Sequence, residues 1–273
     1  MATPGTVFVV ARHAERLDYS IRHAGGNWVA DAKEPYNSPL TERGVAQAAA
    51  TGAAVTAHLK RLELPPVDRL LCSPLLRTVQ TATAAARELG ISKIGIEPRA
   101  GECLCEGFYS SWAVPGADST WGFGEGREYK LEEVHPLAQC DSTELMNISA
   151  QQFLDTLAPD TLLADEIRQV LDTEYQGVPQ SGAYKWGAFE DTEKRLERLQ
   201  SLLDDQGKLG GTVMIVSHGG PTLNICERLG LELGEDPVPY CAVCIFVADP
   251  AAPRGWRVAL APDNAHVEGV EAP

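Results

Sequence analysis

The sequence predicts an α/β protein of three layers, with helices on both faces of a mostly parallel sheet. Short apolar segments alternate with helical ones, in the order strand, helix, strand, helix, strand over residues 6–98. These apolar segments are uniform and show no polar face, which is typical of parallel strands buried on both sides. Polar residues follow several of them, at the edge where open α/β sheets bind ligands.

The first half of the chain carries clear signals for each element. Residues 6–11 predict a buried strand because five of these six residues are apolar. Residues 19–40 are rich in Gly, Asn and Pro and predict a loop. A helix is predicted over 41–64, with Thr41 as its N-cap. A strand over 67–73, a helix over 73–90 and a strand over 92–98 follow, with Pro74 in the helix's first turn and Gly90 past its end.

The regular pattern resumes after residue 185. An amphipathic helix is predicted over 189–206 and a buried strand from residue 211, which runs into Ser-His-Gly-Gly-Pro. Pro221 suits the first position of the next helix, so the glycine amides and this helix's amino end are expected to face the same place as His218. Residues 241–249 and 255–262 predict two closing strands.

The stretch from about 101 to 185 is less regular and predicts a lid inserted into the domain. Its aromatic residues either line a substrate pocket or form the lid's own small core, and both interpretations remain open. They are Phe108, Tyr109, Trp112, Trp121 and Phe123. We expect one domain over residues 1–273, with an acidic, frayed tail over 263–273.

Composition narrows the classes of partner. The net charge of −15 and the pI near 4.8 argue against nucleic acid or an anionic membrane as the main partner, since both require a basic face. No apolar stretch reaches the ~20 residues of a membrane span, and the amino terminus carries no signal-peptide pattern. We therefore expect a cytoplasmic enzyme; the oligomeric state is not readable from the sequence.

The seven cysteines are an odd number and do not suggest a complete disulfide framework. Buried, reduced thiols are the favoured interpretation. A zinc site that joins Cys103 and Cys105 to Cys241 and Cys244 is the alternative, although the CxC spacing is unusual for one. The seven are Cys72, Cys103, Cys105, Cys140, Cys226, Cys241 and Cys244.

Basic groups and histidines follow three of the predicted strands. Arg12, His13 and Arg16 follow the first, Arg77 lies one turn into the helix after the second, and His218 follows a later one. The carboxyl ends of parallel strands share one edge, so these side chains are expected to meet there. Guanidinium groups suit bidentate contacts to phosphate oxygens, and a histidine among them suggests a phosphate-binding nucleophile.

The expected chemistry follows from these charges. Neighbouring arginines favour the neutral form of His13, which is the form able to attack phosphorus. Its other ring nitrogen is expected to donate to a backbone carbonyl, which sets the tautomer. The leaving oxygen needs a proton from a carboxyl group, for which Glu102 and Glu106 are the candidates. Water then attacks the phosphohistidine with the same carboxylate as base, and this route uses no metal and no cofactor.

Four motifs, in order, carry a family resemblance: RHAER, SPLLRTVQTA, LCE at residues 104–106 and SHGGP. Together they resemble the histidine phosphatase superfamily, which has the phosphoglycerate mutase-like fold. The chain is most similar to the branch that contains the suppressor of T-cell receptor signalling phosphatases and the ecdysteroid-phosphate phosphatase. The similarity extends from about residue 6 to residue 260 and is weakest over the lid.

The resemblance implies roles for the motif residues. His13 would be phosphorylated, and the phosphate pocket would consist of Arg12, Arg16, Arg77 and His218. Alignment of the second motif places the family's acid on Glu106, which is preferred here to Glu102. Ala14 stands where the family usually has glycine, and Glu15 and Asp18 are expected to order Arg16.

The predicted function is hydrolysis of phosphomonoesters through a phosphohistidine, that is, a phosphoric monoester hydrolase. The expected substrate is a phosphorylated small molecule or a phosphotyrosine-type group. Mutase-type phosphoryl transfer is one alternative, although mutases usually carry Ser or Thr where Glu15 stands. A catalytically inactive module that binds a phosphorylated ligand on the same fold is the other.

Overall fold

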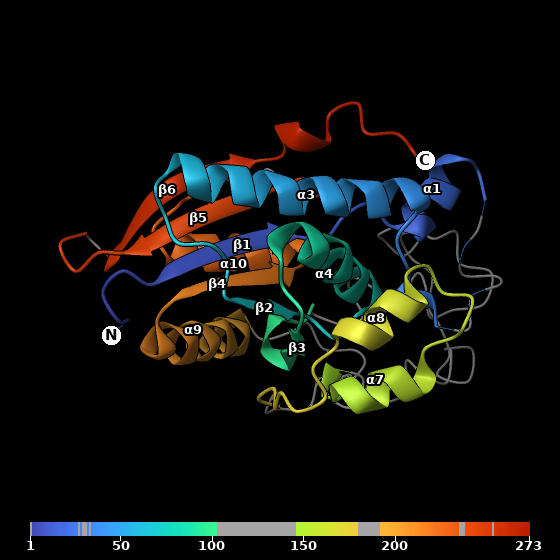
Figure 1. Cartoon of the computed structure of the whole chain (residues 1–273), viewed down its shortest axis with the longest axis horizontal. Helices are drawn as coiled ribbons and strands as arrows, with labels where there is room; N and C mark the ends of the chain where they lie inside the picture. Colours follow the sequence, from blue (N-terminus) through green and yellow to red (C-terminus); the bar gives the residue numbers. More distant parts are fainter. Residues whose placement is uncertain are drawn as a thin grey trace, which may run out of the picture.

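The structure, a computed structural model, describes residues 2–26, 28, 32, 34–102, 146–179, 192–234, 238–252 and 254–273. Within these residues a six-stranded sheet has the order β3-β2-β4-β1-β5-β6 (Figure 1). Neighbours among β3, β2, β4 and β1 pair in parallel, whereas β5 is antiparallel to both β1 and β6. The strands are β1 Val7–Arg12, β2 Arg69–Cys72, β3 Ile94–Ile96, β4 Thr212–Ser217, β5 Val243–Ala248 and β6 Trp256–Asp263.

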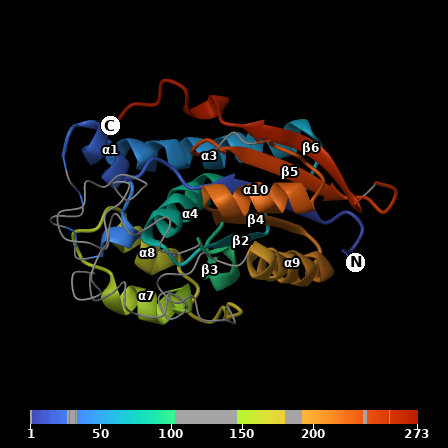
Figure 2. The ribbon, with the colours of Figure 1, turned by 180° about the vertical axis from the view of Figure 1, so that it is seen from behind.

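Helices cover both faces of this sheet, so the predicted three-layer α/β architecture is confirmed. One face carries α3 (Glu42–Arg61) and α4 (Leu76–Leu89), and the other carries α9 (Thr192–Leu209) and α10 (Gly219–Arg228) (Figures 1 and 2). None of the described helices is both long and apolar enough to cross a membrane. The shorter helices are α1 Leu17–His23, α7 Ala150–Thr156 and α8 Ala164–Val170, with the 3-10 turns η1 Pro35–Asn37, η2 Pro98–Ala100 and η5 Ala265–Val267.

The central strand β1 shows why the sheet needs cover on both sides. Val7 and Val9 belong to the apolar cluster that includes side chains of α3 and α4, whereas Phe8 and Val10 belong to the cluster that includes side chains of α9 and α10. All four are fully buried. Each such side chain contributes roughly 1.5–3 kcal/mol relative to exposure, so the uniformly apolar run stabilises both layers at once.

Most helix ends follow their sequence signals, and two starts differ. The Thr41 side chain accepts a hydrogen bond from the Gly44 amide at 2.8 Å, and Gly90 ends α4 with φ 69°. Pro74 lies before α4 instead of in its first turn, because Leu75 is the N-cap. α10 begins two residues before Pro221, which is possible because the first amides of a helix need no intrahelical acceptor. His218 is therefore the N-cap of α10.

Two further predictions need correction. Residues 17–23 form α1 although a loop was predicted from residue 19; Asp18 in its first turn and Arg22 in its last both suit the helix dipole. The tail after residue 262 was predicted to fray, which is wrong for residues 263–267. There β6 ends at Asp263, η5 packs against α3, and His266 Nε2 lies 3.1 Å from Thr51 Oγ1.

Some predictions fall outside the described residues. The lid aromatics and Glu106 belong to residues 103–145, so the lid and the single-domain division remain predictions. The cysteines that are described, Cys72, Cys226, Cys241 and Cys244, are free and buried as predicted, but Cys241 precedes β5 instead of lying in it. No group of three or more metal-ligating side chains occurs among the described residues, and Cys103 and Cys105 of the alternative zinc site are not among these.

The packing of α3 on α4 predicts a strict size limit at Gly52. A Cβ there would lie 2.6 Å from the carbonyl oxygen of Ala85, so Gly52→Ala forces the two helices apart. We expect a loss of roughly 1–3 kcal/mol in the free energy of unfolding, measured with urea. The matched control is Gly207→Ala in α9, where the Cβ would meet only Ala2 near the chain's start at 3.1 Å. A Gly52→Ala protein as stable as this control would contradict the prediction.

Candidate active site

The register of the parallel strands brings three functional segments together. Arg12 at the end of β1 lies opposite Ser217 at the end of β4, and Cys72 at the end of β2 lies opposite Val216. The next amides continue this pairing: His13 N donates to Ser217 O at 2.9 Å. The residues that follow each strand therefore emerge side by side at the end of the sheet where α1 lies (Figure 1).

His13 is held in one tautomer. Its side chain is buried, and Nδ1 lies 2.8 Å from the carbonyl oxygen of Ala14, which can only accept a hydrogen bond. Nδ1 therefore carries the proton, and the neutral ring keeps a lone pair on Nε2. The amide of Ala14 in turn donates to Thr81 Oγ1 at 3.1 Å, so this turn is anchored to α4 with alanine in place of glycine.

His218 lies beside His13, with ring centroids 5.3 Å apart in an edge-on arrangement. Its Nε2 is 2.8 Å from Ser73 Oγ, and Ser73 Oγ already accepts from the Leu75 amide at 3.4 Å. Because a hydroxyl can donate one hydrogen bond and accept two, this contact positions the His218 ring without assigning its tautomer. The buried Nδ1 of His218 has no hydrogen-bond partner among the described residues.

Each predicted phosphate-binding arginine is positioned by a different partner. Arg77 is fully buried and donates from a terminal guanidinium nitrogen to the carbonyl oxygen of Tyr36 at 3.1 Å. Arg16 forms a bidentate pair with Asp18, with Nε to Oδ1 at 2.9 Å and Nη2 to Oδ2 at 2.5 Å. Both partners of that pair are buried. Three guanidinium groups thus reach one place from separate elements, since Arg12 lies at the end of β1.

Glu15 does not order Arg16, contrary to the expectation. Its carboxylate accepts from Thr41 Oγ1 at 2.9 Å and pairs with the exposed side chain of Arg43. Partial burial acts to raise the pKa of Glu15, but the hydrogen bonds from Arg43 and Thr41 outweigh it and the pKa is lowered. Glu15 therefore connects the turn after β1 to the start of α3, and Asp18 alone of the two acidic residues orders Arg16.

The electrostatics of the site favour two neutral histidines. Burial, followed by the charges of Arg77 and Arg12, holds the pKa of His13 well below its ordinary value. Burial and Arg77 lower the pKa of His218 in the same way. Below about pH 6.5 the unfolded chain then binds more protons than the folded one. The stability that these neutral rings contribute is present above that pH and is lost as the pH falls.

Glu102, one of the two candidate acids, lies at this site. A Cβ built on Gly220, in the first turn of α10, would be 3.8 Å from Glu102 Oε1. The carboxylate also raises the pKa of Arg12, although burial is the larger effect there and lowers it. The other candidate, Glu106, lies outside the described residues.

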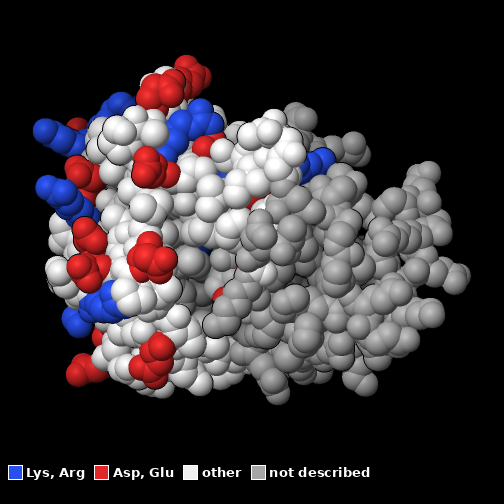
Figure 3. All heavy atoms as spheres, turned by 90° about the vertical axis from the view of Figure 1, so that its right-hand side faces the viewer, with Lys and Arg blue, Asp and Glu red and all other residues white. Residues whose placement is uncertain are grey.

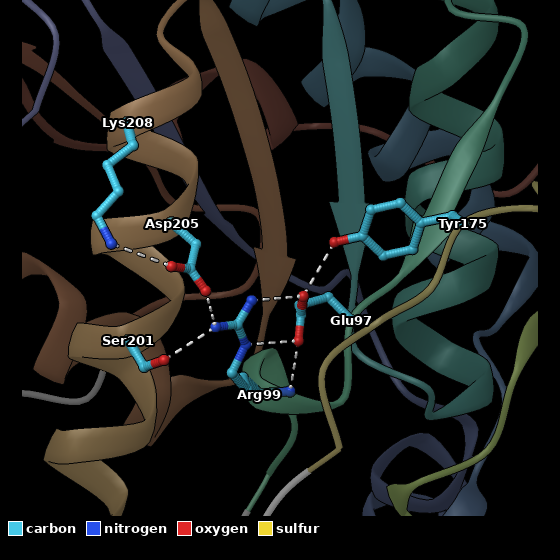
Figure 4. Close-up of polar contacts among 6 residues, drawn as sticks. All are labelled: Glu97, Arg99, Tyr175, Ser201, Asp205 and Lys208. Carbon is cyan, nitrogen blue, oxygen red and sulfur yellow. Dashed lines mark hydrogen bonds and ion pairs between the residues drawn. The ribbon is translucent and has the colours of Figure 1, made fainter.

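A buried ion-pair network precedes Glu102 in the chain (Figure 4). Arg99 donates to both carboxylate oxygens of Glu97, at 2.9 and 3.0 Å, and the Tyr175 hydroxyl donates to the same carboxylate at 2.9 Å. A terminal nitrogen of Arg99 also reaches Asp205 at 2.8 Å and Ser201 at 3.0 Å, both on α9. Charges buried in this way are stable only when paired, so the network fixes η2 against α9.

Two hydrogen bonds fix the backbone that follows this network, at residues 100 and 101. Ser217 Oγ donates to the carbonyl oxygen of Ala100 at 2.6 Å, and Arg198 of α9 donates to the carbonyl oxygen of Gly101 at 3.2 Å. Ser217 directly precedes His218. The segment that bears Glu102 is thus attached to the same strand end as His218.

Two of the site's arginines are buried, and the described part of the neighbouring surface is not basic. Figure 3 views the end of the molecule toward which β1 runs. On the described part of this face, Lys and Arg side chains are interspersed with Asp and Glu and form no field of one sign (Figure 3). Arg16 and Arg77, by contrast, are almost completely inaccessible to solvent. This arrangement suits a small anionic group that enters the site better than a large anionic surface.

The fold and the family resemblance are supported by comparison with known proteins. The model of the histidine phosphatase superfamily (branch 1) matches residues 19–113, which confirms the resemblance predicted from the motifs. A search of curated proteins gave no match. Solved structures show the phosphoglycerate mutase-like fold in this chain, at identities that define the fold alone.

Three of these structures illustrate the likeness. The ecdysone phosphate phosphatase from Bombix mori, in complex with tungstate, is 19% identical with a TM-score of 0.56 and covers 94% of this chain and 92% of its own. A phosphoglycerate mutase from Bacillus anthracis is 18% identical with a TM-score of 0.51, over 98% and 97%. A protein described as mycobacterial hydrolase 1 is 15% identical with a TM-score of 0.50, over 94% and 99%.

Sequence reasoning missed two residues of the site. Ser73 is the hydrogen-bond partner of His218, and its position directly after β2 was the available signal. Tyr240 lies with its ring centroid 5.5 Å from that of His13. It precedes β5, and only the antiparallel direction of that strand brings it to the site.

The neutral state of the two histidines is testable by imidazole nitrogen NMR. At about pH 6, below the ordinary histidine pKa, His13 is expected as the neutral Nδ1–H tautomer and His218 as neutral. After burial, the charge of Arg77 lowers the pKa of both histidines the most. Arg77→Gln removes this charge and is expected to raise both pKa values. Imidazolium signals from His13 at this pH in the unaltered protein would contradict the prediction.

Proposed function

We propose that this chain is a phosphoric monoester hydrolase that acts through a phosphohistidine formed on His13. The observation that carries the proposal is the Nδ1 contact of His13 with the Ala14 carbonyl, in a ring whose pKa is held low by burial and by Arg77. A neutral ring with its proton on Nδ1 presents the Nε2 lone pair, which is what attack on phosphorus needs. The four reduced, buried cysteines support the expected cytoplasmic location.

The proposed phosphate site consists of Arg12, Arg16, Arg77 and His218. A phosphomonoester carries close to two negative charges near neutral pH, which three guanidinium groups balance. His218 Nδ1, a buried atom with no hydrogen-bond partner among the described residues, supplies one more donor when it carries the ring proton. Positioning and electrostatic stabilisation are most of what phosphoryl transfer requires. A bound phosphoryl group also reduces the repulsion among these cations.

For the proton donor we propose Glu102, the alternative that the motif alignment ranked second. Its support is its proximity to the first turn of α10 and the electrostatic interaction with Arg12. In the first step His13 Nε2 bonds to phosphorus while the bond to the leaving oxygen breaks, and that oxygen takes the proton of the carboxyl group. In the second step the carboxylate takes a proton from water, which attacks phosphorus and releases His13 and phosphate.

The nucleophile is tested by His13→Ala, for which we expect loss of at least about 1,000-fold in kcat/KM on an aryl phosphate such as p-nitrophenyl phosphate, since a covalent route disappears. His58→Ala is the matched control, because His58 pairs with Asp263 outside the site, and it should leave kcat/KM unchanged. Urea unfolding checks that both variants are folded.

Other results would reject this function. Full hydrolysis by His13→Ala would exclude the phosphohistidine. Isomerisation of a phosphoglycerate in the presence of a bisphosphoglycerate, without net release of phosphate, would indicate mutase chemistry. An unaltered protein that binds inorganic phosphate but forms no acid-labile phosphoenzyme would be an inactive binding module.

The identity of the acid is tested with Glu102→Gln and Glu106→Gln. Loss of the acid costs about 100-fold to 10,000-fold when the leaving group is a poor one. We therefore expect Glu102→Gln to lose activity on an alkyl phosphate far more than on p-nitrophenyl phosphate, whose leaving group needs little protonation. Glu106→Gln should show no such dependence on the leaving group. The reverse result would return the role to Glu106.

A further inference from the structure

The turn that precedes β5 reaches the active site from the side opposite β4. β5 is antiparallel to β1, so its amino end lies at the edge where β1 ends, with Val243 opposite Ala11. The residues just before it, 238–242, therefore lie beside Arg12 and His13. This turn therefore borders the site on the side of β1 that faces away from β4.

This turn encloses the guanidinium group of Arg12. A terminal nitrogen of Arg12 donates to the carbonyl oxygen of Val238, and the Arg12 amide donates to Ala242 O at 3.1 Å. Arg12 Cζ lies 4.3 Å from the centre of the Tyr240 ring, within the range of a cation–π contact. A Cβ on Gly219 would lie 3.6 Å from the same Cζ. The guanidinium group thus fits between the aromatic ring and the first turn of α10.

The backbone at this turn adopts a costly conformation. Cys241 has φ 59°, in the left-handed region that residues other than glycine rarely occupy. Its side chain is fully buried in a cluster with Ala14 and Leu40, and its amide contacts the carbonyl oxygen of His13 at 3.4 Å. Strain of this kind persists where the surrounding structure imposes it, and it is frequent at functional sites.

The Tyr240 phenol lies close enough to the proposed phosphate-binding arginines to interact with them electrostatically. The ring centroid is 5.5 Å from that of His13, and the phenol group interacts electrostatically with Arg12, Arg16 and Arg77. Burial raises the pKa of Tyr240 despite these arginines, and the nearby Asp18 acts in the same direction as burial. The phenol therefore keeps its proton and is available as a hydrogen-bond donor.

We propose that Tyr240 is a further substrate-contacting residue of this site: its ring holds Arg12 in place, and its hydroxyl donates a hydrogen bond to an oxygen of the bound phosphoryl group. The inference rests on the proposed function for the nature of the substrate. It adds a neutral donor to a set of cations, and a neutral donor stabilises the phosphoryl oxygens without further repulsion of Arg12 and Arg77.

The test separates the hydroxyl from the ring. Tyr240→Phe removes the hydroxyl and keeps the ring, and Tyr240→Leu removes both. Affinity for inorganic phosphate is measured by titration calorimetry, and kcat and KM are measured on p-nitrophenyl phosphate. We expect Tyr240→Phe to weaken phosphate binding about tenfold, the effect of a hydrogen bond to a charged group, and to raise KM in parallel. Tyr240→Leu should weaken binding further, because Arg12 also loses its aromatic contact.

The isosteric Phe variant decides the outcome, since it preserves packing even if Tyr240→Leu is unstable. Phosphate affinity and KM of Tyr240→Phe equal to those of the unaltered protein would overturn the inference. The phosphate titration does not depend on turnover. An unaltered protein that binds phosphate more tightly than Tyr240→Phe but hydrolyses nothing would therefore reject the proposed function and support the role of Tyr240.

Discussion

The concentration of positive charge around His13 is the constraint on which the rest of the site depends. Buried Arg16 and Arg77 and half-buried Arg12 act on two buried histidines, and burial and charge together favour the neutral form of both rings. Such a cluster is stable only because each arginine has a fixed partner: Asp18 for Arg16, and backbone carbonyl oxygens for Arg12 and Arg77. These partners leave the cluster with an excess of cations. This excess of positive charge is what the proposed binding of a phosphoryl dianion requires.

The residues of this site come from several different elements of the fold. β1, β4 and β2 end side by side in register and supply the proposed nucleophile His13, the second histidine and its serine. α4 contributes both Arg77 and, through Thr81, the anchor of the turn at Ala14. The turn before β5 closes the opposite side. No single segment could form the site alone, so its geometry depends on the packing of α3 and α4 on one face and of α9 and α10 on the other.

The sequence predicted the elements whose signals are local. The apolar run of β1, the Thr41 cap and Gly90 each act within a few residues, and all appear in the structure. The sequence could not distinguish partners that depend on tertiary contacts. Glu15 and Asp18 look equivalent beside Arg16, yet Glu15 turns to Arg43. Tyr240 had no local signal, because only the direction of β5 takes it to the site. The tail over 263–273 was predicted to be acidic and frayed, but η5 packs against α3.

The network of Glu97 and Arg99 has a consequence for how activity can diversify on this scaffold. It fastens the segment leading to Glu102 to α9, and the Ser217 hydroxyl fastens the same segment to the end of β4. The backbone that leads to Glu102 is therefore held by contacts with α9 and β4. Residues on the substrate side can change in size and polarity while the chemical groups stay where they are. Under the proposed function, substrate choice and bond cleavage are in this sense separately adjustable.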